Sequence, residues 1–271
     1  MGYLFDPDNW EWLVTARNAR FILEGFLVNV QIALIAMVFS LLFGLALALL
    51  RLSRARAIAT ATGLWIDLWR NLPLILVILY LAIALPEPWR DAYESAAPAF
   101  LPDVLRTGRV FAALLALVLY NSAVLAEIMR AGILSLDRGQ GEAASALGMS
   151  YGQRMRLVIL PQGLRRMVPA MISQLITLNK DTTLVSIIGI QEVMRHGRIL
   201  TGNNFFGGVQ APLLQVLIFI GALFVVTNLL LSRLSRRLEI REQRRTGTKI
   251  KPVSGLEDQV TTATAAASPA P

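Results

Sequence analysis

The chain has 271 residues, of which 55% are hydrophobic and 16% charged, and its formal net charge is +8. Soluble domains average about 45–50% apolar and about 25% charged residues, so this composition predicts an integral membrane protein. The basic residues are spread through loops and one tail without interleaved aromatic residues, which does not favour nucleic-acid binding. The absence of cysteine excludes disulfides and cysteine metal sites, and the single histidine, His196, argues against a histidine metal centre.

Five segments approach the roughly 20 apolar residues that a helix needs to cross a hydrocarbon core. They lie at roughly 21–50, 60–86, 110–134, 164–192 and 211–232. The first has a long charge-free run and no cleaved signal-peptide pattern, so we expect it to be retained. The fourth contains Lys180 and Asp181. A charge near mid-bilayer costs about 2.5–3.5 kcal/mol, so this helix is expected to pack among other helices or to line a cavity. The sequence thus predicts an all-α integral membrane protein with five transmembrane helices.

The distribution of basic residues predicts the orientation of these helices. The intervals after the first, third and fifth segments hold 3, 5 and 8 Lys and Arg, whereas the N-terminal segment and the other two intervals hold 2, 3 and 2. The positive-inside rule therefore places the N-terminus outside and the C-terminus in the cytoplasm. The predicted organisation is an extracytoplasmic segment over 1–20, a membrane domain over 21–240 with a cytoplasmic loop at 135–163, and a largely disordered cytoplasmic tail over 241–271.

The cytoplasmic loop contains the stretch GEAASALG, which predicts a short helix. Glu142 is expected in its first turn, where an acid suits the positive end of the helix dipole, and Gly148 is expected to end it. The alanines leave little side chain to hold the helix away from a partner, so it suits a groove on another protein. The alternative is an interfacial helix that caps the bundle.

The residues of this loop resemble the EAA motif of permease subunits of binding-protein-dependent ABC importers. Glu142-Ala143-Ala144 is followed after three residues by Gly148 and later by the pair Leu160-Pro161. The flanking stretches AEIMRAGI, VILPQGLRRMVPA and KDTTLVSIIGIQEV are similar to those of the polar amino-acid permease family, and the resemblance covers roughly 20–240. The motif residues with an expected role in ATPase coupling are Gly139, Gln140, Glu142, Ala143, Ala144, Gly148 and Pro161.

The resemblance implies a type I importer fold in a prokaryotic cell membrane, with several partners. These are two cytoplasmic ATPases that carry ATP and Mg²⁺, a second permease that is a sister chain or an identical copy, and an extracytoplasmic amino-acid-binding protein. No cofactor is expected on this chain, and it is not expected to be an enzyme, since it has no GxxxxGK[ST] motif. Glutamate or another acidic amino acid is favoured as substrate; glutamine, histidine or arginine are alternatives, as is an ATP-independent channel. His196, in an external loop, is a candidate contact for the binding protein.

Polar residues in the third and fourth segments predict a substrate pathway. On the fourth, Gln174 and Asp181 share one helix face, and Asn179, Thr183 and Ser186 share an adjacent one. The expected pathway residues are Asn121, Glu127, Arg130, Gln174, Asn179, Lys180, Asp181, Thr182, Thr183 and Ser186. The alternatives are hydrogen bonds between helices for the fourth segment, and a structural ion pair between Glu127 and Arg130 for the third.

Overall fold

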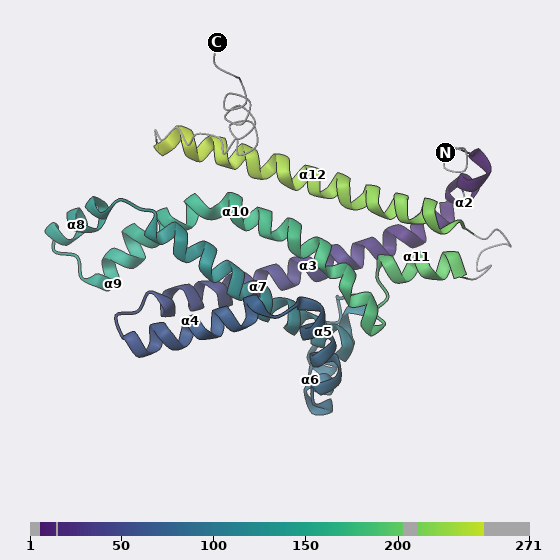
Figure 1. Ribbon diagram of the computed structural model, residues 1–271, viewed down its shortest axis with the longest axis horizontal. Helices are drawn as coiled ribbons and strands as arrows, with labels where there is room; N and C mark the ends of the chain where they lie inside the picture. Colours follow the sequence, from purple (N-terminus) through teal and green to yellow (C-terminus); the bar gives the residue numbers. More distant parts are fainter. Residues whose placement is uncertain (1–5, 15, 203–210, 247–271) are drawn as a thin grey trace, which may run out of the picture.

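The computed structural model describes residues 6–14, 16–202 and 211–246, and every regular element in these ranges is a helix. The elements are η1 (Pro7–Trp10), α2 (Glu11–Val14), α3 (Ala16–Arg51), α4 (Arg56–Asn71), α5 (Leu74–Ala84), α6 (Glu87–Ala96), η2 (Asp103–Arg106), α7 (Gly108–Leu134), α8 (Arg138–Ala146), α9 (Tyr151–Arg154), η3 (Met155–Ile159), α10 (Leu160–Asp181), η4 (Thr182–Ile188), α11 (Val193–Gly202) and α12 (Leu213–Thr246). Helices α3, α10 and α12 run along the long axis (Figure 1). Helix α8 lies at one end of this bundle and α2 and α11 at the other.

The centre of the bundle is the packing of α3 against α7. Small residues on both helices let them approach closely. A Cβ on Gly44 of α3 would lie 3.0 Å from the carbonyl oxygen of Ser122 on α7, and Ala123 and Ala126 beside it are fully buried. The outward face of α3 instead exposes large apolar side chains such as Leu42, which is 62% exposed. Because hydrocarbon solvates such a face, this arrangement is the one expected of a helix between protein and lipid.

Among the residues that the structure describes, three helices are long and apolar enough to cross a membrane by length and composition, namely α3, α7 and α12. Helices α4 and α5 together would form a fourth span if the bent pair is one crossing. Helix α10 has 22 residues but is not among these candidates. The five-span arrangement therefore stays a prediction.

The single helix predicted over 60–86 is wrong, because the structure has α4 and α5 there, bent by 99°. Leu72 and Pro73 between them have extended backbones, with ψ of 134° and 123°. The proline ring disfavours the helical conformation for the residue before it, and proline cannot donate the helical hydrogen bond. Pro73 thus ends α4 and starts α5 in a new direction.

The fourth predicted helix also has different limits. It begins before 164, since α9, the π-helical turn η3 and α10 follow one another without a break in helical backbone. The π turn directly precedes Pro161, whose ring excludes the carbonyl group four residues earlier and so widens the helix there. After Asp181 the chain forms the 3-10 helix η4, which ends at Gly189 with φ of 82°, a conformation that favours glycine.

Helices also occupy regions that were predicted as loops or tail. Helices α6 and α11 lie in the two intervals expected outside, and α12 continues to Thr246, beyond the predicted limit at 232 and into the predicted disordered tail. The rest of that tail, 247–271, lies outside the described residues.

A prediction follows from the crossing of α7 and α10. A Cβ on Gly132 would lie 2.7 Å from the carbonyl oxygen of Gly163, whereas a Cβ on Gly221 of α12 would meet nothing within 4 Å. We expect Gly132→Ala to destabilise the protein by about 1–3 kcal/mol through overpacking, and the matched Gly221→Ala to be neutral or stabilising, because alanine favours helix. Thermal unfolding of the two variants in detergent measures the difference. Equal unfolding midpoints would show that the two helices do not cross at Gly132.

Candidate functional site

Helix α8 carries five of the seven predicted coupling residues and is capped at both ends. It begins at Arg138, and the side chain of Asp137 accepts a hydrogen bond of 2.8 Å from the backbone N–H of Gly139. Glu142 therefore lies in the second turn, and its expected place in the first turn is wrong. The capping acid is Asp137, so the exposed carboxylate of Glu142 has no structural task at the helix start.

The C-terminal end of α8 confirms the prediction for Gly148. Its φ is 78°, and its N–H donates to the carbonyl oxygen of Ser145 at 3.0 Å. The N–H of Met149 donates to the carbonyl oxygen of Ala144 at 3.2 Å, which completes a Schellman motif. A short helix with both ends satisfied keeps its shape without a partner.

One face of α8 is attached to the rest of the protein and the other is free of the chain. Arg154 of α9 donates to the carbonyl oxygen of Gly141 at 3.2 Å and to the hydroxyl of Ser145. Ala144 is buried on this face. The exposed residues include four of the predicted coupling set, namely Gly139, Gln140, Glu142 and Ala143. Pro161, the remaining member, lies near the start of α10 and not on α8.

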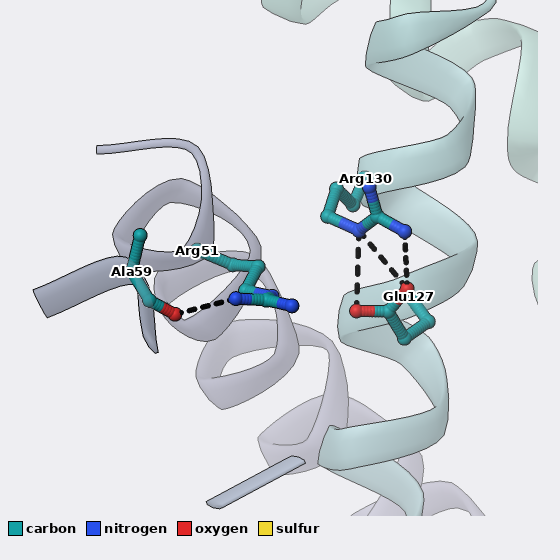
Figure 2. A network of polar contacts seen from close by, with 4 residues as sticks. All are labelled: Arg51, Ala59, Glu127 and Arg130. Carbon is teal, nitrogen blue, oxygen red and sulfur yellow. Dashed lines mark hydrogen bonds and ion pairs between the residues drawn. The ribbon is translucent and has the colours of Figure 1, made fainter. Parts of the chain in front are cut away.

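Glu127 and Arg130 of α7 form the ion pair that their spacing predicts. Arg130 donates to Oε2 of Glu127 through Nη2 at 2.7 Å and through Nε at 2.9 Å. Arg51, at the end of α3, points its guanidinium toward Glu127 and donates to the carbonyl oxygen of Ala59 at 2.7 Å (Figure 2). A Cβ on Gly63 of α4 would collide with that guanidinium, so glycine leaves the space that Arg51 fills. The pair thus lies where α3, α4 and α7 meet.

Four of the predicted pathway residues make hydrogen bonds between helices, and one of them, Thr182 of η4, accepts from Asn29 on α3. Gln174 of α10 donates to the side-chain oxygen of Asn121 on α7 at 2.7 Å. Asn179 of α10 donates to Asn228 of α12 at 3.4 Å, and Asn121 and Asn179 are both buried. These contacts hold α10 between its neighbours, as the interhelical alternative for this stripe expects.

The other polar residues of this stripe are more accessible. Lys180 is exposed, and Asp181 and Thr183 are partly exposed. Within the described part of the chain neither Lys180 nor Asp181 has an ion pair, and as neighbours in sequence they lie about 100° apart around the helix. Ser186 is buried, and its hydroxyl donates to the carbonyl oxygen of Thr183 at 2.9 Å. Gln174 is also partly exposed, but its amide is bonded to Asn121. Among the described residues, the accessible members of the predicted set on α10 and η4 without a hydrogen bond to another helix are therefore Lys180, Asp181 and Thr183.

A buried carboxylate at the start of α11 is absent from the predicted set. Glu192 is fully buried, and its Oε1 accepts from the backbone N–H of Arg195 at 2.9 Å. Its Oε2 accepts from the side-chain amide of Asn29 on α3 at 2.9 Å. The same amide donates to the hydroxyl of Thr182 at 3.1 Å, and Asn29 Oδ1 accepts from the N–H of Val193 at 3.0 Å. One amide on α3 thus connects η4 and α11. The signal in the sequence was an asparagine in the mostly apolar stretch FLVNVQIALI and a glutamate just after the stretch SIIGIQ.

His196 has a structural position. It lies on α11 and not in a loop, and its ring stacks on Phe21 of α3 with centroids 4.0 Å apart. Its Nδ1 lies 2.6 Å from the carbonyl oxygen of Phe21. Burial lowers the pKa of the His196 imidazole, and a Cβ on Gly25 would collide with the ring. The packing of this side chain fixes α11 against α3, which does not support its expected role as a docking contact.

Comparison with known proteins identifies the family. Residues 20–240 match the family described as binding-protein-dependent transport system inner membrane component. The chain belongs to this family. It is accordingly a multi-pass permease component of an ABC transporter in the cell membrane.

Individual relatives cover most of the chain. The permease is 34% identical over 225 residues to the probable glutamine ABC transporter permease protein GlnP of Bacillus subtilis, which covers 83% of this chain and 95% of that protein. It is 31% identical to the glutamate/aspartate import permease protein GltK of Escherichia coli O157:H7 over 84% of this chain and 98% of that one. A crystal structure of an amino acid ABC transporter with histidines has a TM-score of 0.68 and 29% identity, covering 85% of this chain and 98% of its own.

The Glu192 cluster of the permease leads to a stability prediction. Glu192→Gln offers one side-chain oxygen where two are used, so a buried donor at the start of α11 loses its partner. We expect hydrogen exchange at the amides of Val193 and Arg195 to rise by about tenfold or more. The control is Glu24→Gln, which removes an exposed ion pair with Arg20 and should leave this exchange unchanged. Unchanged exchange in both variants would show that Glu192 does not hold α11.

Proposed function

We propose that the permease forms half of the translocation pathway of an importer for a polar amino acid. Two ATPase subunits bind and hydrolyse ATP with Mg²⁺, a second permease completes the pathway, and an extracytoplasmic binding protein delivers the amino acid. The chain itself carries no cofactor and no catalytic residue. In this assembly α8 faces the cytoplasm, and α6 and α11 face outward. The observation that carries the proposal is α8, a helix capped at both ends with an exposed Glu142 and the EAA residues.

The attachment of α8 supports a mechanical role. A displacement of α8 by an ATPase passes through Arg154 to α9, which continues through η3 into α10. Because these helices share one unbroken backbone, they move together more readily than they bend. The π-helical turn η3, before Pro161, lies between α8 and most of α10. Its geometry sets the direction in which a displacement of α8 moves α10.

The pathway is proposed at the accessible part of α10 and η4. Lys180 and Asp181 offer opposite charges for the carboxylate and ammonium of an amino acid, and Thr183 offers a hydroxyl. Gln174 and Thr182, which make hydrogen bonds to other helices, hold α10 and η4 in the position that leaves Lys180, Asp181 and Thr183 accessible. The Glu127–Arg130 pair and Ser186 remain further candidates for contact with substrate as the helices move.

The proposed substrate is glutamate or another acidic amino acid. The relatives include a probable permease for glutamine and permeases for glutamate/aspartate and arginine, and these support a polar amino acid as the class. Glu127 is paired with Arg130, and the guanidinium of Arg51 points toward the same carboxylate, so positive charge exceeds negative charge here. This excess adds support for an anionic solute in this part of the protein.

The coupling role of α8 is tested by charge reversal in the reconstituted transporter. We expect Glu142→Lys to abolish ATP-dependent uptake from a panel of glutamate, glutamine and arginine, while membrane insertion and assembly stay intact, because the residue is exposed and has no structural contact. The control Arg241→Glu reverses a charge of the opposite sign, by the same amount, on the exposed end of α12 and should transport normally. Normal uptake by Glu142→Lys would remove α8 from the coupling path.

Neighbouring threonines test the pathway. Thr183 is partly exposed and bonds only its own helix, whereas Thr182 is fully buried against Asn29. We expect Thr183→Leu to block uptake while the complex assembles, because added methylenes occupy the path of the solute. Thr182→Leu should instead reduce recovery of the complex, since overpacking costs about 1–3 kcal/mol. Recovery in detergent and uptake in vesicles separate these effects. Normal uptake by Thr183→Leu would show that the face of η4 that carries Thr183 does not line the pathway of the solute.

A further inference from the structure

A groove lies where the end of α3 meets the segment that follows α8. It has a volume of about 650 Å³. Its floor is apolar, with Ala46, Leu49 and Leu50 from α3 and Met155 from η3, and its rim carries Arg54 and Tyr151. The groove therefore combines an apolar bed with a basic and aromatic edge.

The charge at the rim has no acidic partner in the described residues. Arg54 is exposed, and no carboxylate lies within ion-pair distance of it in the part of the chain that the structure describes. Its guanidinium carbon lies 4.4 Å from the centre of the Tyr151 ring, and that of Arg154 lies 5.6 Å from the same centre. The ring holds the Arg54 side chain in place by a cation–π contact while its N–H donors remain available.

The apolar bed continues along α3 away from the basic rim. Leu42 and Phe43, one turn before Ala46 on the same side of the helix, are 62% and 56% exposed. They lie within the candidate membrane span, whereas Arg54 lies just after its end at Arg51. A ligand that matches the whole surface is therefore charged at one end and a long hydrocarbon at the other.

We propose that this groove binds an anionic phospholipid of the cytoplasmic leaflet. The phosphate accepts hydrogen bonds from Arg54 beside Tyr151, and an acyl chain lies over Ala46, Leu49 and Leu50 toward Leu42. Charge complementarity selects this occupant, because the cytoplasmic leaflet is rich in anionic lipids and each arginine near its surface contributes to their binding. The inference rests on the proposed orientation, which places the end of α3 in the cytoplasm. It does not depend on the transported substrate.

The position of the groove gives the lipid a consequence for coupling. One wall belongs to α3, at the centre of the bundle, and the other belongs to Tyr151 and Met155, in the helix that is tied to α8 by Arg154. A lipid that touches both walls resists their separation. The anionic lipid thus stabilises the contact between α3 and the helical segment to which α8 is attached.

The proposal is tested by native mass spectrometry of the assembled transporter in detergent, titrated with dioleoyl phosphatidylglycerol or dioleoyl phosphatidylcholine. We expect a preference for phosphatidylglycerol that Arg54→Gln weakens by about fivefold. Ala46→Phe, which fills the bed, should weaken both lipids. The matched control Arg241→Gln removes an exposed arginine elsewhere and should change neither.

Two results would overturn the proposal. Equal phosphatidylglycerol affinity in the wild type and Arg54→Gln would show that the groove does not recognise the phosphate. Binding by the isolated chain that disappears in the assembled transporter would show that a partner subunit covers the groove. The titration is done in detergent and measures lipid binding, not transport. A negative result would therefore reject the lipid site alone, while the proposed orientation and the proposed uptake are tested by their own experiments.

Discussion

The structure depends on one requirement, that the amide and carboxylate side chains taken into the bundle find hydrogen-bond partners within the protein, since hydrocarbon offers none. The cluster around Asn29 shows the requirement most clearly. Its amide group binds both Glu192 and Thr182, and its oxygen binds the first N–H of α11. The start of η4, the start of α11 and the middle of α3 are held together by these few bonds. The break between η4 and α11 is thereby fixed at one place.

The same requirement connects the two ends of the molecule. At the end with α8, Arg154 joins that helix to the helical run that becomes α10. Along α10, Gln174 and Asn179 bind α7 and α12, and at its far end Thr182 reaches Asn29. Polar contacts thus join the run of α10 and η4 to α7, α12 and α3. The accessible Lys180 and Asp181 lie between the contacts of Asn179 and Thr182, and Thr183 follows them. A helix held by a few separate side-chain hydrogen bonds can shift relative to its neighbours when those bonds break and form with other partners.

Composition, hydropathy and the EAA residues were sufficient to predict an all-helical membrane permease and the helix that carries Glu142. Short-range rules also explain the Gly148 end. The same rules account for two features that differ from the predictions, namely the bend at Pro73, since helix is disfavoured for the residue before proline, and Asp137 as the cap of α8. The pairings of Asn121, Asn179 and Glu192 could not be predicted, because helical periodicity gives the face on which a residue lies but not which helix covers that face.

The central claim is that α8 lies in the cytoplasm and α6 outside, and single cysteines in this cysteine-free chain test it directly. Ala96→Cys on α6 and Ala146→Cys on α8 are both exposed positions. Intact cells are treated with an impermeant maleimide, and the remaining thiols are then tagged in denaturant. The account predicts that the maleimide blocks the cysteine at 96 and leaves the one at 146 free for the tag. The opposite pattern would invert the topology and remove α8 from the reach of the ATPases.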